Sequence, residues 1–255
     1  MKYLTIIFSF FICQATAQLP ERELVFPSKD NLDVGSEYKN YKWLLDEQGF
    51  PKEFIPYFDY KDFEDFEPMG YLVADPPFHE EPDPNKIPKD KLHTYYQRGI
   101  DSTTVDYLSE LLYKAKEPIL SNFYLGYENY RFTWTRSFHN DYILTLVSKE
   151  ENAEIQITEI DKNSGQLKKS SKKIKQHEFE EFKMMLINAN FWIMKSYKWT
   201  LGNDGSRWTI EAHVPLAYKV LSRWSPNLYY EDDLILRQLG TWLINKSGIK
   251  VKEIY

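Results

Sequence analysis

The chain has 255 residues, and its 38 acidic and 32 basic side chains give a formal net charge of −6. Nucleic acid and anionic lipid bind proteins through an excess of basic residues, so neither is expected as a partner. The single cysteine, Cys13, has no second thiol with which to form a disulfide. The length suits one domain with an appendage, or two small domains.

Residues 1–17 have the pattern of a cleavable signal peptide. Lys2 precedes an apolar run, 3–13, that is too short to span a bilayer, and Ala15-Thr16-Ala17 offers the small side chains that signal peptidase requires. We therefore expect an exported protein, periplasmic or extracellular, with no transmembrane segment after cleavage. Lipidation of Cys13 is a weaker alternative, because Ile12 stands where a lipoprotein signal has a small residue.

Residues 18–100 differ in composition from the rest of the chain and are interpreted as an irregular arm. They mix acidic with aromatic residues and become proline-rich between Pro76 and Pro88. Each proline removes a backbone donor and fixes φ, which favours extended coil. Disordered segments are poor in aromatic residues, so we expect Tyr and Phe side chains to hold this arm against the main domain. Docking of the same side chains on a partner protein is the alternative.

From residue 101 onward the pattern is typical of a domain of the α+β class. Helical spacing of apolar residues appears at 101–117, 177–190 and 231–245. Strand-like alternation appears at 130–138, 142–148, 153–160, 207–213 and 217–224, with a lysine-rich strand after 165 and an edge strand at 249–254. Strands in series without repeated βαβ units predict a mostly antiparallel sheet with two or three packed helices. The lysine-rich strand is expected to be exposed to solvent.

Several short motifs in this domain resemble those of an uncharacterised group of bacterial proteins. They are YRFTWTRSFH at 130–139, Phe191-Trp192, DGSRWTIE at 204–211 and RWSP at 223–226, followed by the final Ile254-Tyr255. The resemblance covers roughly residues 120–255 and supports the domain boundary, but the group implies no activity. The chain departs from the group's pattern at 212–219, where Val214-Pro215 replaces a glycine-containing turn.

The hairpin formed by 207–213 and 217–224 predicts a candidate anion site. A two-residue turn at its tip is expected to bring Glu211 and Arg223 onto one polar surface. In this hypothesis Arg136 and Arg223 grip a carboxylate or another anion while Glu211 orients one of them. The alternative is a structural ion pair packed among tryptophans. The full candidate ligand-binding set is Arg136, His139, Asp204, Trp208, Glu211, Arg223 and Trp224.

No motif in the sequence indicates an established chemistry. His139 and His213 are too few for a zinc site, no G-x-S-x-G elbow occurs, and no glycine-rich phosphate loop occurs. We therefore expect no metal and no cofactor. The leading hypothesis is a non-enzymatic binding or interaction module of the cell envelope whose partner is a protein or a small anionic ligand. The alternatives are a hydrolase of cell-wall or dietary polymers that uses Glu211 and Asp204, and a purely structural envelope component.

Overall fold

A computed structural model describes residues 46, 50–58, 63, 102–121, 127–149, 152–198, 204–214, 217–251 and 253–254. The predicted signal peptide, 1–17, and most of the predicted arm, 18–100, lie outside the described residues. The predicted domain, 101–255, is described over most of its length.

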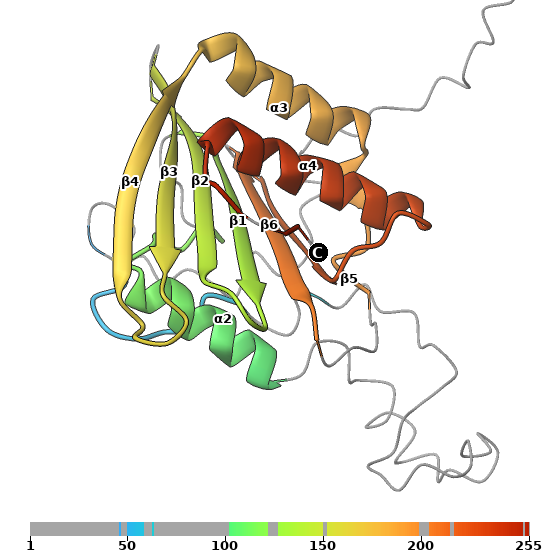
Figure 1. Cartoon of the computed structure of the whole chain (residues 1–255). Helices are drawn as coiled ribbons and strands as arrows, with labels where there is room; N and C mark the ends of the chain where they lie inside the picture. The colour runs from blue at the N-terminus through green and yellow to red at the C-terminus, as the bar shows by residue number, and fades with distance from the viewer. Residues whose placement is uncertain are drawn as a thin grey trace, which may run out of the picture.

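The domain is built on a seven-stranded sheet with the order β4-β3-β2-β1-β6-β7-β5 (Figure 1). The strands are β1 (Asn129–Arg136), β2 (Asp141–Lys149), β3 (Asn152–Ile160), β4 (Leu167–Ile174), β5 (Tyr197–Lys198), β6 (Ser206–Val214) and β7 (Ala217–Trp224). Neighbouring strands are antiparallel except for the short β5, which pairs with β7 in parallel. The predicted α+β class is confirmed.

Helices cover both faces of this sheet. They are α2 (Ser102–Lys114), α3 (Gln176–Asn188) and α4 (Glu231–Ser247), and a short 3-10 helix, η6, lies at Phe191–Ile193. Figure 1 shows α3 and α4 on one face and α2 on the other. None of the described helices combines the length and apolarity needed to cross a membrane.

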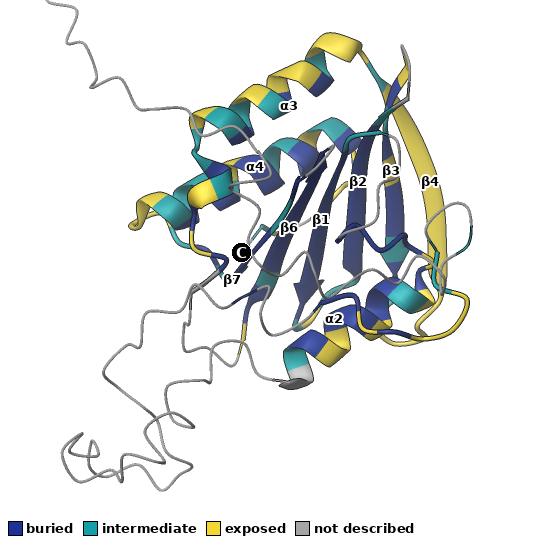
Figure 2. Cartoon of the chain, turned by 180° about the vertical axis from the view of Figure 1, so that it is seen from behind, coloured by how far each residue is buried: buried dark blue, intermediate teal, exposed yellow. Residues whose placement is uncertain are grey.

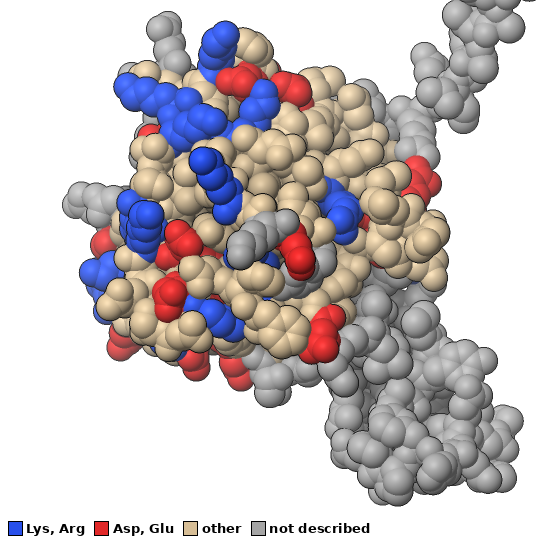
Figure 3. Space-filling view, in the orientation of Figure 1, with Lys and Arg blue, Asp and Glu red and all other residues tan. Residues whose placement is uncertain are grey.

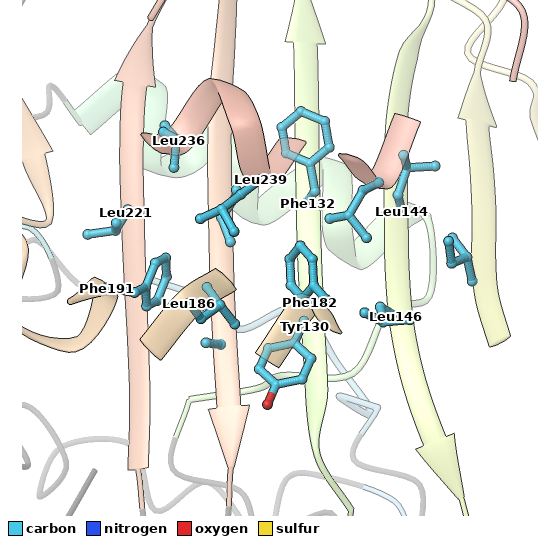
Figure 4. Close-up of a cluster of buried hydrophobic side chains, with 14 of the residues drawn as sticks. Tyr130, Phe132, Leu144, Leu146, Phe182, Leu186, Phe191, Leu221, Leu236 and Leu239 are labelled. Atoms are coloured by element: carbon cyan, nitrogen blue, oxygen red, sulfur yellow. The ribbon is translucent and has the colours of Figure 1, made fainter. Parts of the chain in front are cut away.

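The larger core lies between the sheet and the α3/α4 layer. Alternate side chains of β1, namely Tyr130, Phe132 and Trp134, point to this face because successive residues of a strand point to opposite sides. They pack with helix residues such as Phe182 and Leu239 (Figure 4). The intervening residues of β1 therefore point toward α2.

A second core joins α2 to the opposite face of the sheet. Leu108 and Leu112 of α2 are fully buried there with Ile143 of β2. Ile55, Tyr57, Phe58 and Phe63, which belong to the predicted arm, share this core. The Tyr57 amide donates to Ser109 Oγ at 3.1 Å. These arm residues are therefore held against the domain by aromatic side chains, and the arrangement of the rest of the arm stays a prediction.

The lysine-rich strand β4 is exposed from Leu167 to Lys173, as predicted, and forms one edge of the sheet. Figure 2 shows it exposed beside the buried strands β1, β2 and β6. Lys and Arg side chains gather along this flank in Figure 3. Charged side chains on an edge strand are a common protection against pairing with another chain.

Two details of the prediction are wrong: the edge strand at 249–254 and the end of the first helix. The described residues of 249–254 form no edge strand: Ile249 and Ile254 pack against the α3/α4 core instead, and Arg237 Nη2 donates to the Ile254 carbonyl at 2.8 Å. The first helix ends at Lys114 rather than near Glu117, because Lys116 turns the chain with a φ of 52°.

Candidate functional site

Glu211 is engaged inside the protein by a residue that the sequence hypothesis did not consider. Arg131 of β1 lies beside it across the strands, and both side chains face α2. The Arg131 Nε and Nη2 atoms donate to the two carboxylate oxygens of Glu211 at 2.6 Å each. Glu211 is 1% exposed and also accepts a hydrogen bond from the Tyr218 hydroxyl. Burial acts to lower the pKa of Arg131, but the Glu211 carboxylate outweighs it and raises that pKa overall.

The expectation that Glu211 and Arg223 share one surface is wrong. The register of β6 and β7 pairs Glu211 with Val220 and Trp208 with Arg223. Directly paired residues point to the same face, so Glu211 faces α2 while Arg223 faces the α3/α4 layer. There, Arg223 donates to the carbonyls of Lys195 and Ser196 and lies 3.6 Å from the Asp233 carboxylate of α4.

A second buried carboxylate, Glu117, lies on the α2 face near the Glu211 pair. The hydroxyls of Thr145 and Thr158 donate to its two oxygens at 3.4 and 3.3 Å. Burial raises the pKa of Glu117 above its ordinary value, and the nearby Arg131 opposes this shift without cancelling it. Two acids and one fully buried guanidinium therefore form a polar layer beneath α2.

The raised pKa of Glu117 predicts a pH-dependent effect of Glu117→Gln. A carboxyl whose folded pKa lies above its unfolded value costs stability once the pH exceeds the unfolded value, because the unfolded chain then ionises more readily. Glu117→Gln removes this cost and can still accept from Thr145 or Thr158. We therefore expect the variant to gain stability relative to wild type at pH 7 and to gain less at pH 4. Urea unfolding midpoints at the two pH values measure this, and an equal difference at both would contradict it.

A cavity of about 400 Å³ opens on the α2 face, where β1, β6 and β7 approach the first turns of α2. Its lining residues are Thr104, Tyr107, Thr135, Arg136, Ser137, Lys162, Arg207 and Trp224. The strand alternation explains three of these residues, since Thr135, Arg207 and Trp224 all lie on the α2 face of the sheet. Lys162 enters from the loop between β3 and β4.

The lining of this cavity is cationic. Lys162 and Arg207 contribute their charges to it, and the described lining residues include no Asp or Glu. Arg136 also lines the cavity, but its guanidinium stacks on Trp134 and Tyr142 of the α3/α4 core. The carboxylate of Asp141 is buried and lies 3.4 Å from Lys162 Nζ. Asp141 also accepts from the Tyr107 hydroxyl at 2.7 Å, and burial next to this carboxylate raises the pKa of Tyr107. Asp141 thus positions Lys162 and Tyr107 at the cavity wall.

An aromatic ring accompanies these cations. The guanidinium of Arg207 lies over the ring of Trp224 at 5.5 Å from its centroid, and both side chains are partly exposed. Cation–π geometry of this kind holds an arginine in place while its remaining donors stay oriented for hydrogen bonding. Arg136 differs, because its guanidinium stacks over Trp134 and Tyr142 and its Nε donates to the Asn140 carbonyl at 2.7 Å.

The structure brings two of the seven candidate residues, Arg136 and Trp224, together at the cavity. Trp208 is fully buried under α4, and Glu211 and Arg223 lie buried on opposite faces. The other two, His139 and Asp204, are partly or fully exposed and do not line the cavity. The sequence hypothesis missed Arg207, Lys162 and Tyr107. Arg207 alternates with Trp208 in the same strand, but the roles of Lys162 and Tyr107 depend on contacts distant in sequence.

The paired carboxylates of the hydrolase hypothesis are not arranged around one bond. Asp204 precedes β6 and Glu211 lies well inside it. Glu211 is five positions beyond Ser206 along the extended strand, which is a span of roughly 17 Å. Glycosidase carboxyls stand about 5–9.5 Å apart, and Glu211 is sealed by Arg131 and Tyr218.

His213 is also buried on the α2 face. Its Nδ1 lies 2.7 Å from the Leu120 carbonyl, and burial lowers its pKa despite this bond. Within the described part of the chain, no three residues of the His, Cys, Asp and Glu types gather in a way that could hold a metal ion.

Comparison with known proteins adds no relative: no protein-family model matches the chain, and no curated protein matches it. The resemblance to an uncharacterised bacterial group therefore stays a prediction. The fold and cavity define the protein as an α+β domain with a cationic, tryptophan-bearing pocket between the sheet and α2.

Proposed function

We propose that this protein is an exported binding module of the cell envelope that takes a small anionic ligand in the cavity beneath α2. The location rests on residues 1–17 of the sequence. The observation that supports the ligand class is the lining, which contains the two cationic residues Lys162 and Arg207 on the α2 side and no acid among its described residues.

The arrangement of the cations suits an oxyanion such as a carboxylate or phosphate. Lys162 and Arg207 come from different elements and both line the cavity. Hydrogen bonds from Lys and Arg to such groups are charge-assisted and stronger than neutral ones. Thr104 lies in the first turn of α2, so the positive end of the helix dipole adds to the field at the cavity.

Trp224 indicates that the ligand has a flat or apolar part beside its charge. Its ring forms part of the cavity wall and is already stacked with Arg207. An aromatic face favours planar groups through stacking and burial of apolar area. We therefore expect a small aromatic carboxylate to bind more tightly than inorganic phosphate, which offers charge alone.

The test is a titration of the purified protein with benzoate, inorganic phosphate and neutral benzamide, followed by calorimetry. Benzoate is expected to bind best, and Arg207→Gln or Lys162→Gln is expected to weaken it about tenfold or more, which corresponds to a lost charge-assisted contact. Lys173→Gln, on exposed β4, is the matched control and should bind as wild type does.

Two outcomes would contradict the proposal. One is binding of benzamide as tight as that of benzoate, which would show that charge plays no part. The other is an absence of any loss in both cavity variants while circular dichroism confirms that they are folded. Binding of none of the three compounds would equally remove small oxyanions as the ligand class.

A further inference from the structure

The edge of the sheet formed by β4 is a feature that the cavity does not explain. Among the described residues, β4 pairs with β3 alone, so its other side carries backbone groups with no strand beside them. All eight residues of β4 are exposed or partly exposed. The opposite edge, β5, has two residues, so β4 is the long edge of this sheet.

The register shows which amides of β4 face outward. Asp161 N donates to the Gln166 carbonyl at 2.9 Å just beyond the last paired residues, Ile160 and Leu167. Antiparallel pairs alternate between hydrogen-bonded and non-hydrogen-bonded. Counting from 161 and 166, Lys168, Ser170 and Lys172 are bonded to β3. The amides and carbonyls of Lys169, Ser171 and Lys173 therefore point away from the sheet.

The side chains along this edge are strongly basic. The eight residues of β4 include four lysines, Lys168, Lys169, Lys172 and Lys173, and no acid. Alternation places Lys168 and Lys172 on the α3/α4 side and Lys169 and Lys173 on the α2 side. Figure 3 shows basic side chains along the flank where β4 lies.

The charge of these lysines determines which kind of strand could pair with the β4 edge. A second copy of β4 would place lysine against lysine, and like charges on facing strands are destabilising. The side chains of an acidic strand would place carboxylates beside the lysines. Its backbone carbonyls would accept hydrogen bonds from the outward-pointing amides of β4. The same side chains therefore exclude self-pairing and favour one class of partner.

We propose that the β4 edge binds an extended acidic segment of another protein as an added antiparallel strand. Backbone hydrogen bonds at Lys169, Ser171 and Lys173 supply the attachment, and the lysines on both faces of the strand select acidic side chains. Lys169, Ser171 and Lys173 do not line the cavity beneath α2, so the two sites use different residues.

The test uses the full mature chain and a fluorescent eight-residue peptide of alternating Glu and Val, read by anisotropy. Two control peptides are a Lys-Val analogue with reversed charge and a Glu-Pro analogue that keeps the charge but lacks the amides needed for strand pairing. The Glu-Val peptide is expected to bind at least tenfold more tightly than either control. It is also expected to slow amide exchange at residues 169, 171 and 173 more than at 168, 170 and 172, which are already bonded to β3.

Variants separate the backbone contribution from the charge contribution. Ser171→Pro removes an outward amide and should weaken binding of the Glu-Val peptide at least tenfold, whereas Ser171→Ala should leave it unchanged. Lys172→Glu with Lys173→Glu should abolish the binding. Equal binding of the Glu-Pro peptide, or wild-type affinity in Ser171→Pro, would overturn strand addition in favour of a purely electrostatic patch. Failure of the Glu-Val peptide to bind would leave the lysines only a solubilising role and overturn the proposal entirely.

Discussion

Replacing Arg131 with methionine is expected to lower the free energy of unfolding by about 3–5 kcal/mol, the usual cost of leaving one partner of a buried ion pair uncompensated. Arg131 is fully buried, and it neutralises Glu211 through two hydrogen bonds of 2.6 Å. Its Nη1 also donates to the Pro118 carbonyl at 2.7 Å. Urea unfolding followed by tryptophan fluorescence measures the loss.

A double variant tests whether the unpaired carboxylate causes this loss. Arg131→Met with Glu211→Met removes both charges, and buried pairs replaced by apolar residues of similar size often cost little. The double variant is therefore expected to recover most of the stability that Arg131→Met loses. If the double variant is as unstable as the sum of both single variants, the two residues act independently and the buried pair is not the cause.

Gly240→Ala is expected to destabilise the protein by about 1–3 kcal/mol, although alanine is the better helix former. Gly240 is buried in α4, where the helix lies against the sheet. A methyl group there would come within 2.5 Å of the Trp208 ring and 3.0 Å of Phe132. The indole ring of Trp208 therefore packs directly against the backbone of α4 at Gly240, where there is no room for a side chain.

Two further variants isolate this contact. Gln238→Ala, at an exposed position of the same helix, should be neutral or slightly stabilising because it changes helix propensity alone. Trp208→Phe removes the part of the indole ring that the new methyl would meet, so it should relieve part of the cost of Gly240→Ala. Additive losses in the double variant would show that α4 moves away from the sheet rather than clashing with Trp208.

The candidate site shows why the alternation of side chains along each strand is insufficient to locate a functional surface. Glu211 and Arg223 were assigned to one face, but the face on which a residue of β7 lies depends on its register with β6. Pairing of Val214 with Ala217 sets that register and sends the two side chains to opposite sides. A shift of one residue in register inverts the faces of a strand.

The sequence pattern also predicts that Glu211 lies on a polar surface where a ligand could bind. In the structure α2 and residues 55–58 cover that face, so Arg131 and Glu211 neutralise each other in the interior. Opposite charges on the polar faces of two strands are a signal for such a pair. This signal predicts the Arg131–Glu211 pair only when β1 and β6, which are far apart in sequence, are known to be neighbours.

The sequence by itself determined the α+β class, the positions of six strands and three helices to within a few residues, and the exposed lysine-rich strand, because periodicity and turn residues act locally. Tertiary structure alone decided that the sheet is covered on both faces, that Glu211 pairs with Arg131, and that Lys162, Arg207 and Trp224 line one cavity. These contacts join residues tens of positions apart, and their geometry follows from strand order and register, which no local pattern encodes.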